Sequence, residues 1–319
     1  MSARFAKILC TGLLVAAATT GATTGAATNT AAQNTNTSNT TPPDQAEWAE
    51  TCEPWDDWNK AAPPFQIHGN TYYVGTCGIA VILVTGENGH ILIDSGTAKS
   101  ANLVANNIRA LGLDPADVSI MLHSHEHHDH VGGFAALKTI TNARITASVA
   151  GARVLGTGLV GKDDPQYGTL DPMNPAAADT LVLGGEVVEL GKLQLTAVET
   201  PGHSPGALSW QWRSCSGKDA RKNCKSIIYA DSLSPVSGDG YRFSDHAGYV
   251  AKYRQALGRV AALDCDILLT PHPSHSKMIR RIEGGDGLVD PSACRRFSAA
   301  QSNLLDKRLD AEAEGIHGK

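Results

Sequence analysis

A short run of the chain concentrates side chains that bind transition metals. His125, His127, Asp129 and His130 form the pattern H-x-H-x-D-H. Imidazole and carboxylate groups are ligands that suit zinc. Side chains two residues apart at a strand end point the same way, so His125 and His127 would face one centre. Asp129 and His130 lie at the expected turn into a helix and would face a second centre, so the pattern favours two adjacent metal ions.

The segments around this run could position such ligands. Residues 118–122 are mostly apolar and predict a short buried strand, and residues 131–138 predict the start of a helix. A surface histidine tract would not require these flanks. His203, in the tight loop T-P-G-H, and His272, just beyond the buried strand expected at 267–270, are two further candidate ligands. Six ligands divide into two sets of three, and three protein ligands plus water is the open arrangement of catalytic zinc.

Strand and helix patterns alternate along the rest of the chain. Strands are expected around the turn dipeptide Gly69-Asn70 and at 79–85, 90–94, 144–148, 181–183, 187–190, 193–199, 207–213 and 225–230. Helices are expected at 98–111, 131–140, 247–263 and 291–314. Residues 151–179 are rich in Gly, Asp and Pro, which predicts a long loop that forms a lid, and residues 156–176, with Tyr167 and Met173, are expected to contact the variable side chains of the substrate. We predict one layered α/β domain over residues 44–319.

The N-terminal residues predict export. Arg4 and Lys7 precede an apolar stretch at 8–18 and then small residues, which is the layout of a signal peptide. The apolar stretch is too short to span a membrane. We assign residues 1–27 to the signal peptide, without fixing the cleaved bond, and 28–43 to a disordered Thr/Asn-rich linker. A periplasmic protein without a membrane anchor in its mature chain is expected.

Six cysteines follow the signal peptide, and an even number in an exported chain favours disulfides. Six cysteines allow fifteen connectivities. Zinc ligation by thiolate is the alternative, but no C-x-x-C spacing is present. Pairing of sequence neighbours gives Cys52–Cys77, Cys215–Cys224 and Cys265–Cys294.

Together, the H-x-H-x-D-H run, the T-P-G-H loop and the late strand-end histidine resemble the metallo-β-lactamase superfamily over about residues 65–280. Ser232 stands where other subclasses carry a cysteine ligand, and this feature, the Leu269-Thr-Pro-His272-Pro segment and the Cys265…Cys294 spacing resemble the B3 subclass. The resemblance implies an αββα sandwich: two mixed β-sheets with helices on the outer faces and the metals at one edge.

The resemblance also implies two zinc ions per chain, each held by three side chains. The ligand sets would be His125, His127 and His203 for one ion, and Asp129, His130 and His272 for the other. Ser232 would orient a zinc-bound water, Ser234 would lie near the substrate carboxylate, and Asp94 would orient a ligand imidazole from behind. Three further histidines match no ligand position of the family and are expected to be spectators: His123, His128 and His275.

The function implied is hydrolysis of the β-lactam ring amide of penicillins, cephalosporins and carbapenems, which would give antibiotic resistance. Two zinc ions lower the pKa of a shared water, and the resulting metal-bound hydroxide would attack the ring carbonyl. Asp129 is the expected catalytic residue, because it both binds metal and can orient the hydroxide or relay its proton. The partner would be the small-molecule β-lactam, and a monomer is expected.

Two other functions remain open on the sequence. A thioesterase of the glyoxalase II type or a lactonase would use an Asp to bridge the metals, and Asp231 aligns with that residue after a shift of one position. If Ser232 faces the metals instead, the lactamase is favoured. A non-catalytic zinc-binding exported protein is the third possibility, although an open two-site ligand set is unlike a storage site. The net charge of −5 and the lack of a basic stripe argue against nucleic acid as a partner.

Overall fold

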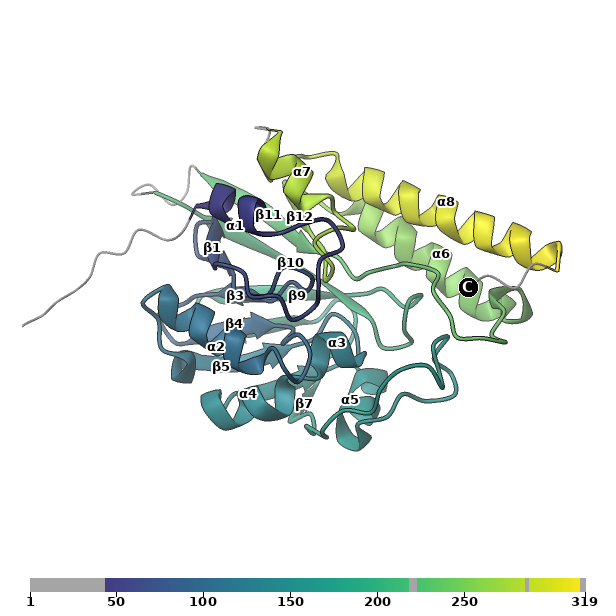
Figure 1. Ribbon diagram of the computed structural model, residues 1–319, viewed down its shortest axis with the longest axis horizontal. Coiled ribbons are helices and arrows are strands. Elements are labelled where there is room, and N and C mark those ends of the chain that lie inside the picture. Colours follow the sequence, from purple (N-terminus) through teal and green to yellow (C-terminus); the bar gives the residue numbers. More distant parts are fainter. Residues whose placement is uncertain (1–43, 218–222, 285–286, 316–319) are drawn as a thin grey trace, which may run out of the picture. The chain divides into compact units, whose positions relative to one another are not determined.

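The computed structural model describes residues 44–217, 223–284 and 287–315, in which two β-sheets lie between outer helices (Figure 1). The seven-stranded sheet has the order β1-β2-β3-β4-β5-β6-β7, and the five-stranded sheet has the order β12-β11-β10-β9-β8. Both sheets mix parallel and antiparallel pairs. The predicted αββα class is therefore confirmed. The predicted signal peptide and linker, residues 1–43, lie outside the described residues.

The first sheet and its helices come from the N-terminal part of the described chain. Its strands are β1 (Phe65–His68), β2 (Thr71–Tyr73), β3 (Ile82–Val84), β4 (His90–Ile93), β5 (Val118–Leu122), β6 (Arg144–Ala147) and β7 (Thr180–Leu181). The accompanying α-helices are α1 (Gln45–Thr51), α2 (Ala101–Ala110), α3 (His128–Val131), α4 (Phe134–Thr141) and α5 (Val149–Thr157). Strands β4 to β7 run parallel, so their carboxyl ends share one edge.

The second sheet and its helices follow in sequence. Its strands are β8 (Val187–Leu190), β9 (Leu193–Glu199), β10 (Leu208–Cys215), β11 (Cys224–Tyr229) and β12 (Ile267–Leu269). The α-helices are α6 (Ala247–Ala262), α7 (Met278–Glu283) and α8 (Ala293–Ala313). Short 3₁₀ turns occur at Pro115–Asp117 and Phe243–Asp245. None of the helices in the described ranges is long and apolar enough to cross a membrane.

Alternation along the central strands builds the layers. In β5, Ile120 and Leu122 face the core between the sheets, whereas Met121 packs under the helices of the first half. Successive strand residues point to opposite faces, so a strand covered on both sides needs apolar residues throughout. Trp210 of β10 is fully buried in the inter-sheet core, and its indole N–H donates to the carbonyl of His123 over 2.8 Å. A third apolar cluster lies beneath α6 and α8.

Several helical segments differ from the sequence predictions. The helix expected at 131–140 is split, because α3 already starts at His128 and a glycine pair separates it from α4. The loop expected from residue 151 is wrong at its start, since α5 runs from Val149 to Thr157. Ser148 caps this helix by accepting from the Gly151 N–H, and Val154 and Leu155 bury its inner face. Helices α1 and α7 were not predicted.

The three predicted cysteine pairs are bonded in the structure, as Cys52–Cys77, Cys215–Cys224 and Cys265–Cys294. The first ties the N-terminal segment to the end of the β2 region. The second joins β10 to β11, and the third fastens α8 to the loop before β12. No cysteine of these pairs is free to bind metal.

Candidate metal centre and active site

The six predicted ligands lie at the ends of strands from both sheets. His125 and His127 follow β5, and Asp129 and His130 belong to α3. His203 lies in the loop between β9 and β10, and His272 lies three residues after β12. Five of the six are buried, and His272 is partly exposed. Strand ends of both sheets thus bring together residues that are up to 147 positions apart in the sequence.

Asp129, His130 and His272 form a triangle of donor atoms. Asp129 Oδ2 lies 3.0 Å from His130 Nε2 and 3.3 Å from His272 Nε2, and the two nitrogens are 3.3 Å apart. Zinc bonds of 2.0–2.1 Å at tetrahedral angles place neighbouring donor atoms about 3.3 Å apart. The triangle therefore fits a zinc ion. The His272 and Asp129 side chains are 14% and 8% exposed, so the solvent reaches this set through them.

The second cluster, His125, His127 and His203, has donor atoms within 4.8 Å of one another. Each imidazole is held through one nitrogen, and the second nitrogens of His127 and His203 lie 3.5 Å and 3.3 Å from the Gln166 amide nitrogen. His125 Nδ1 lies 2.9 Å from Asp231, His127 Nε2 lies 2.9 Å from Asp164, and His203 Nδ1 lies 3.0 Å from the Ser234 hydroxyl. His125 Nε2 is buried and has no hydrogen-bond partner among the described residues. This pattern, with a partner behind each ligand, is typical of metal-binding histidines.

The two clusters are adjacent and strongly coupled electrostatically. His125, Asp129 and His130 also have donor atoms within 4.8 Å of one another. Burial lowers the pKa of His130, but the carboxylates of Asp129 and Asp94 outweigh it and raise that pKa to about 10. Burial likewise raises the pKa of Asp129, and its imidazole neighbours outweigh this and hold it well below its ordinary value. Without metal, Asp129 and His130 are an ion pair.

Zinc binding is expected to release protons at neutral pH, because His130 must lose its proton to become a ligand. Burial lowers the pKa of His127, but the Asp164 carboxylate outweighs it and raises that pKa, so His127 can add to the release. Burial lowers the pKa of His203 to about 3, so that imidazole is already neutral and releases none. The affinity of the Asp129–His130–His272 set should rise about tenfold per pH unit through the neutral range. Calorimetric titration of zinc in buffers of different ionisation enthalpy measures the release. Binding heats that are the same in all buffers would contradict the prediction.

Asp94, predicted to orient a ligand imidazole, lies behind His130. Its Oδ2 is 3.6 Å from His130 Nδ1. The same carboxylate accepts from the Ser124 amide over 2.6 Å, the Ser124 hydroxyl over 2.7 Å and the Tyr229 hydroxyl over 2.7 Å. Asp94 has a φ of 65°, in the left-handed region that residues other than glycine disfavour. The backbone of Asp94 therefore adopts a disfavoured conformation beside the candidate ligand His130.

Asp231 and Ser232 were the two candidates for the position facing the metals. Asp231 Oδ1 lies 2.9 Å from His125 Nδ1, whereas His125 Nε2 has no hydrogen-bond partner among the described residues, so Asp231 lies behind the nitrogen that is left for a metal. Burial raises the pKa of Asp231 to about 7. The Ser232 hydroxyl is buried and has no hydrogen-bond partner among the described residues. Leu233 follows with a φ of 45°, and the Ser234 hydroxyl contacts His203. This arrangement favours Asp231 as an orienting group over Asp231 as a bridge.

The three histidines expected to be spectators make other contacts. His123 accepts at Nε2 from the Ser148 amide, and burial lowers its pKa to about 4. His128 lies in α3 with its ring 6.0 Å from that of Trp58. His275 packs edge-on against Trp55 at 4.9 Å, and burial lowers its pKa to about 3. None of the three belongs to the donor clusters found in the described residues.

Sequence reasoning missed three residues that the structure brings to the site. Asp164 and Gln166 come from the segment after α5, and Gln166 Nε2 lies 3.3 Å from His203 Nε2 and 3.5 Å from His127 Nδ1. The ring of Trp58 lies 5.8 Å from that of His272. All three belong to irregular segments without periodicity, so no sequence signal indicated their direction. Asp164 contacts the candidate ligand His127, so the segment predicted as a lid also helps to orient a ligand.

Comparison with known proteins agrees with this geometry. Residues 74–216 match the metallo-beta-lactamase superfamily. The solved structure of the MIM-2 metallo-beta-lactamase shares 51% identity and a TM-score of 0.79, and the match covers 84% of this chain and 98% of that one. The chain therefore belongs to the metallo-β-lactamase superfamily. It is an enzyme of the hydrolase class, as are the similar solved structures.

The chain is also similar to further solved structures and curated proteins. MIM-1 from Novosphingobium pentaromativorans is 48% identical with a TM-score of 0.81, over 85% of this chain and 99% of that one. MEM-A1, a subclass B3 metallo-beta-lactamase from a soil metagenome library, is 41% identical with a TM-score of 0.76, over 81% and 100%. A hydroxyacylglutathione hydrolase of Anaeromyxobacter dehalogenans (strain 2CP-C) is 30% identical over 185 residues. That match covers 58% of this chain and 56% of the relative, and the next covers 34% of its relative, so these curated relatives are spanned only in part.

Proposed function

We propose that this chain is a B3-type metallo-β-lactamase that hydrolyses the ring amide of β-lactam antibiotics with two zinc ions. The observation that carries the proposal is the donor geometry. Asp129, His130 and His272 lie at zinc spacing, and beside them are three imidazoles whose donor atoms lie within 4.8 Å of one another. The near full-length similarity to solved metallo-β-lactamases supports the substrate class.

Bound zinc would lower the pKa of a water molecule and polarise the lactam carbonyl. The residues of this chain would do the rest. Asp129 has a pKa well below its ordinary value, and its donor atom lies within 4.8 Å of that of His125 in the other ligand set, so its carboxylate can hold the attacking water and accept its proton. The unpartnered Ser232 hydroxyl is available to orient that water. Asp94, Asp164, Asp231 and Ser234 would fix the imidazoles from behind, which keeps the donor atoms in place during turnover.

Hydrolysis of a chromogenic cephalosporin by the exported form of the chain tests the proposal. We expect turnover with zinc and its loss after a chelator removes the metal. Restored turnover after zinc is added back separates metal dependence from damage to the protein. A protein that is shown to hold two zinc ions and still does not open the ring would contradict the proposal.

A thioesterase remains the second candidate, because curated relatives are named hydroxyacylglutathione hydrolase. A glutathione thioester assay beside the cephalosporin assay decides between the two. The position of Asp231 behind His125 favours the lactamase. Thioester turnover that exceeds cephalosporin turnover would reverse the assignment.

Export to the periplasm and a monomeric state belong to the same proposal. Three disulfides support export, because such bonds persist in oxidising compartments. Fractionation of cells that express the full chain would locate the protein, and sedimentation would give its mass in solution. Reduced cysteines in the isolated protein would argue against export.

Trp58 is expected to contact the bound substrate beside His272, as part of the substrate wall of the site. Its side chain is 42% exposed, and its ring lies 5.8 Å from the imidazole of His272. An aromatic contact contributes about 1 kcal/mol, so Trp58→Ala should raise KM about fivefold and leave kcat nearly unchanged. Steady-state kinetics with one cephalosporin would measure both constants.

Trp55 provides the matched control for this variant. It is 65% exposed and lies farther from His272, at 6.5 Å, with its ring against His275. Trp55→Ala should change KM less than Trp58→Ala does. Equal effects of the two substitutions would show that Trp58 has no special place in the substrate wall.

A further inference from the structure

Glu126 is a buried carboxylate placed between two candidate ligands, His125 and His127. Its side chain reaches the loop 201–206. Glu126 Oε2 accepts from the Ser204 hydroxyl over 2.7 Å, and Oε1 accepts from the Gly206 amide over 2.7 Å. The side chain is 1% exposed. Both oxygens of one buried carboxylate are therefore used to hold the loop that carries His203.

The contact between Glu126 and the loop is close. A Cβ on Gly206 would come within 2.7 Å of Glu126 Oε2 and within 2.6 Å of the Gly151 amide nitrogen. Only glycine lets the loop backbone approach the carboxylate at this distance. The Ser148 hydroxyl, which caps α5, donates to the Gly206 carbonyl over 2.7 Å. Glu126 thus binds the amide of Gly206, and Ser148 binds the carbonyl of the same residue.

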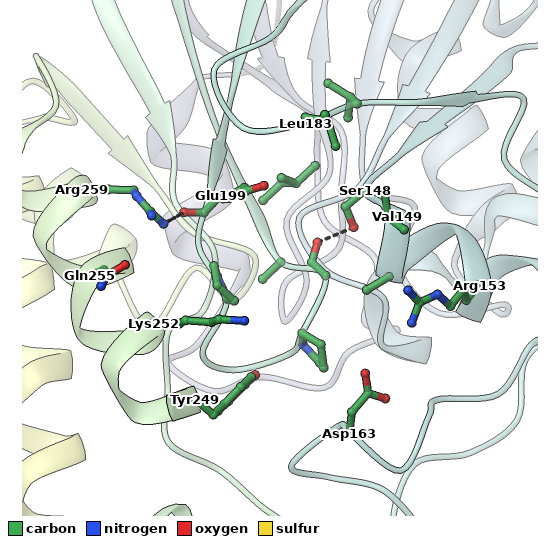
Figure 2. A pocket seen from close by; sticks show the side chains of 17 residues that line it. Ser148, Val149, Arg153, Asp163, Leu183, Glu199, Tyr249, Lys252, Gln255 and Arg259 are labelled. Atoms are coloured by element: carbon green, nitrogen blue, oxygen red, sulfur yellow. Dashed lines mark hydrogen bonds between the residues drawn. The ribbon is translucent and has the colours of Figure 1, made fainter. Parts of the chain in front are cut away.

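The other side of this loop is only partly packed, because Gly202 lies against the Tyr253 ring but Pro201, Pro205 and Gly206 border a pocket. A pocket of about 560 Å³ lies there, lined by residues of the loop and, across it, by Tyr249 and Lys252 of α6 (Figure 2). The dashed line from Ser148 in Figure 2 marks the bond to the loop. No candidate metal ligand lines the pocket. Packing on that side is limited to the close contact between the Gly202 backbone and the Tyr253 ring, so around Gly206 the loop is held by the bonds made from the ligand side.

We propose that Glu126 is a positioning residue: it fixes the loop 201–206 and thereby sets the metal affinity of the His125–His127–His203 cluster. The inference rests on the proposed role of His203 as a ligand. Ser234 orients the His203 ring, but it does not hold the loop backbone. Because Glu126 belongs to the ligand run itself, it connects His203 directly to the segment that carries the other two imidazoles.

The test measures zinc affinity, not turnover. In a His272→Ala background, which disables the second ligand set, competition with a chromogenic chelator reports the His125–His127–His203 cluster alone. Glu126→Ala should weaken zinc binding about 10- to 100-fold, the usual effect of losing a group that positions ligands. Glu126→Gln should largely restore affinity, because its amide oxygen still accepts from Gly206 and its nitrogen can donate to Ser204. Ser204→Ala removes one bond and should weaken binding less, and it serves if Glu126→Ala does not fold.

Glu312 of α8 offers a matched control. It is a buried carboxylate that accepts from two backbone amides, those of Phe243 and Ser244, far from the ligand loop in sequence. Glu312→Ala should lower the melting temperature of the metal-free protein without changing zinc affinity. Unchanged affinity in folded Glu126→Ala, or an equal loss in Glu312→Ala, would overturn the inference. If the unsubstituted protein binds one zinc ion instead of two, the ligand assignment itself is wrong. That result is distinct from a failure of the role proposed for Glu126.

Discussion

Asp129→Asn is expected to lower kcat about 10²- to 10⁴-fold while the protein stays folded, which is the range for losing a group that transfers a proton. The carboxylate lies within 3.0 Å of His130 and 3.3 Å of His272, and its pKa is well below the ordinary value, so it is an acceptor at neutral pH. An amide oxygen can still approach a metal, but it cannot take the proton of an attacking water. Kinetics at saturating zinc, with the bound zinc counted, would measure the effect.

Asp163→Asn is the matched control for this variant. Asp163 is an exposed carboxylate of the segment after α5, immediately before the buried Asp164. The same loss of charge at Asp163 should leave kcat within about twofold. Near-native turnover in Asp129→Asn loaded with two zinc ions would remove Asp129 from the catalytic role and leave it only a metal ligand.

Trp210→Ala is expected to cost about 3–5 kcal/mol of the free energy of unfolding. The indole is fully buried in the core between the sheets, on a strand paired on both sides. Truncation leaves a large cavity and also removes the hydrogen bond to the carbonyl of His123. Urea unfolding, with the disulfides intact, measures the loss. Domains are stable by only about 5–15 kcal/mol, so a substantial unfolded fraction is expected at moderate temperature.

The exposed Trp58 supplies the comparison for this core substitution. Trp58→Ala removes the same side chain from a partly exposed site and should change the free energy of unfolding by less than about 1 kcal/mol. Trp210→Phe keeps most of the packing and should lie between the two. Equal losses at Trp210 and Trp58 would show that the inter-sheet core does not depend on this indole.

The sequence predicted those parts of the site whose chemistry is carried by residue type. His125, His127, Asp129 and His130 could be recognised because few other roles need such residues at that spacing. The strand at Val118–Leu122 was predicted with its observed bounds, since a strand buried on both faces is apolar throughout. The three disulfides followed from pairing neighbours, and the structure confirms each.

Apart from Asp94, the sequence did not predict the groups that orient the candidate ligands from behind. Glu126 looks like an ordinary spacer between two histidines, and its bonds to Ser204 and Gly206 depend on tertiary contacts 78 and 80 residues apart. Asp164 lies in a segment without periodicity, so its direction towards His127 could not be predicted. Helix α5 was missed because its glycines hide its period, and tertiary packing of Val154 and Leu155 outweighs the weak propensity.

The left-handed backbone of Asp94 has a consequence for the energy landscape of the chain. Of the five residues other than glycine with positive φ in the described ranges, Asp94 and Leu233 adjoin candidate ligands or their supports, and Trp55 and Lys277 lie around His275. Each such residue costs about 1–3 kcal/mol that the remaining structure must offset. Local frustration is thus present beside the metal centre at Asp94 and Leu233, and the well-packed cores tolerate it. Sequences selected only for greater stability would therefore be expected to relax these positions first and to lose the geometry of the centre with them.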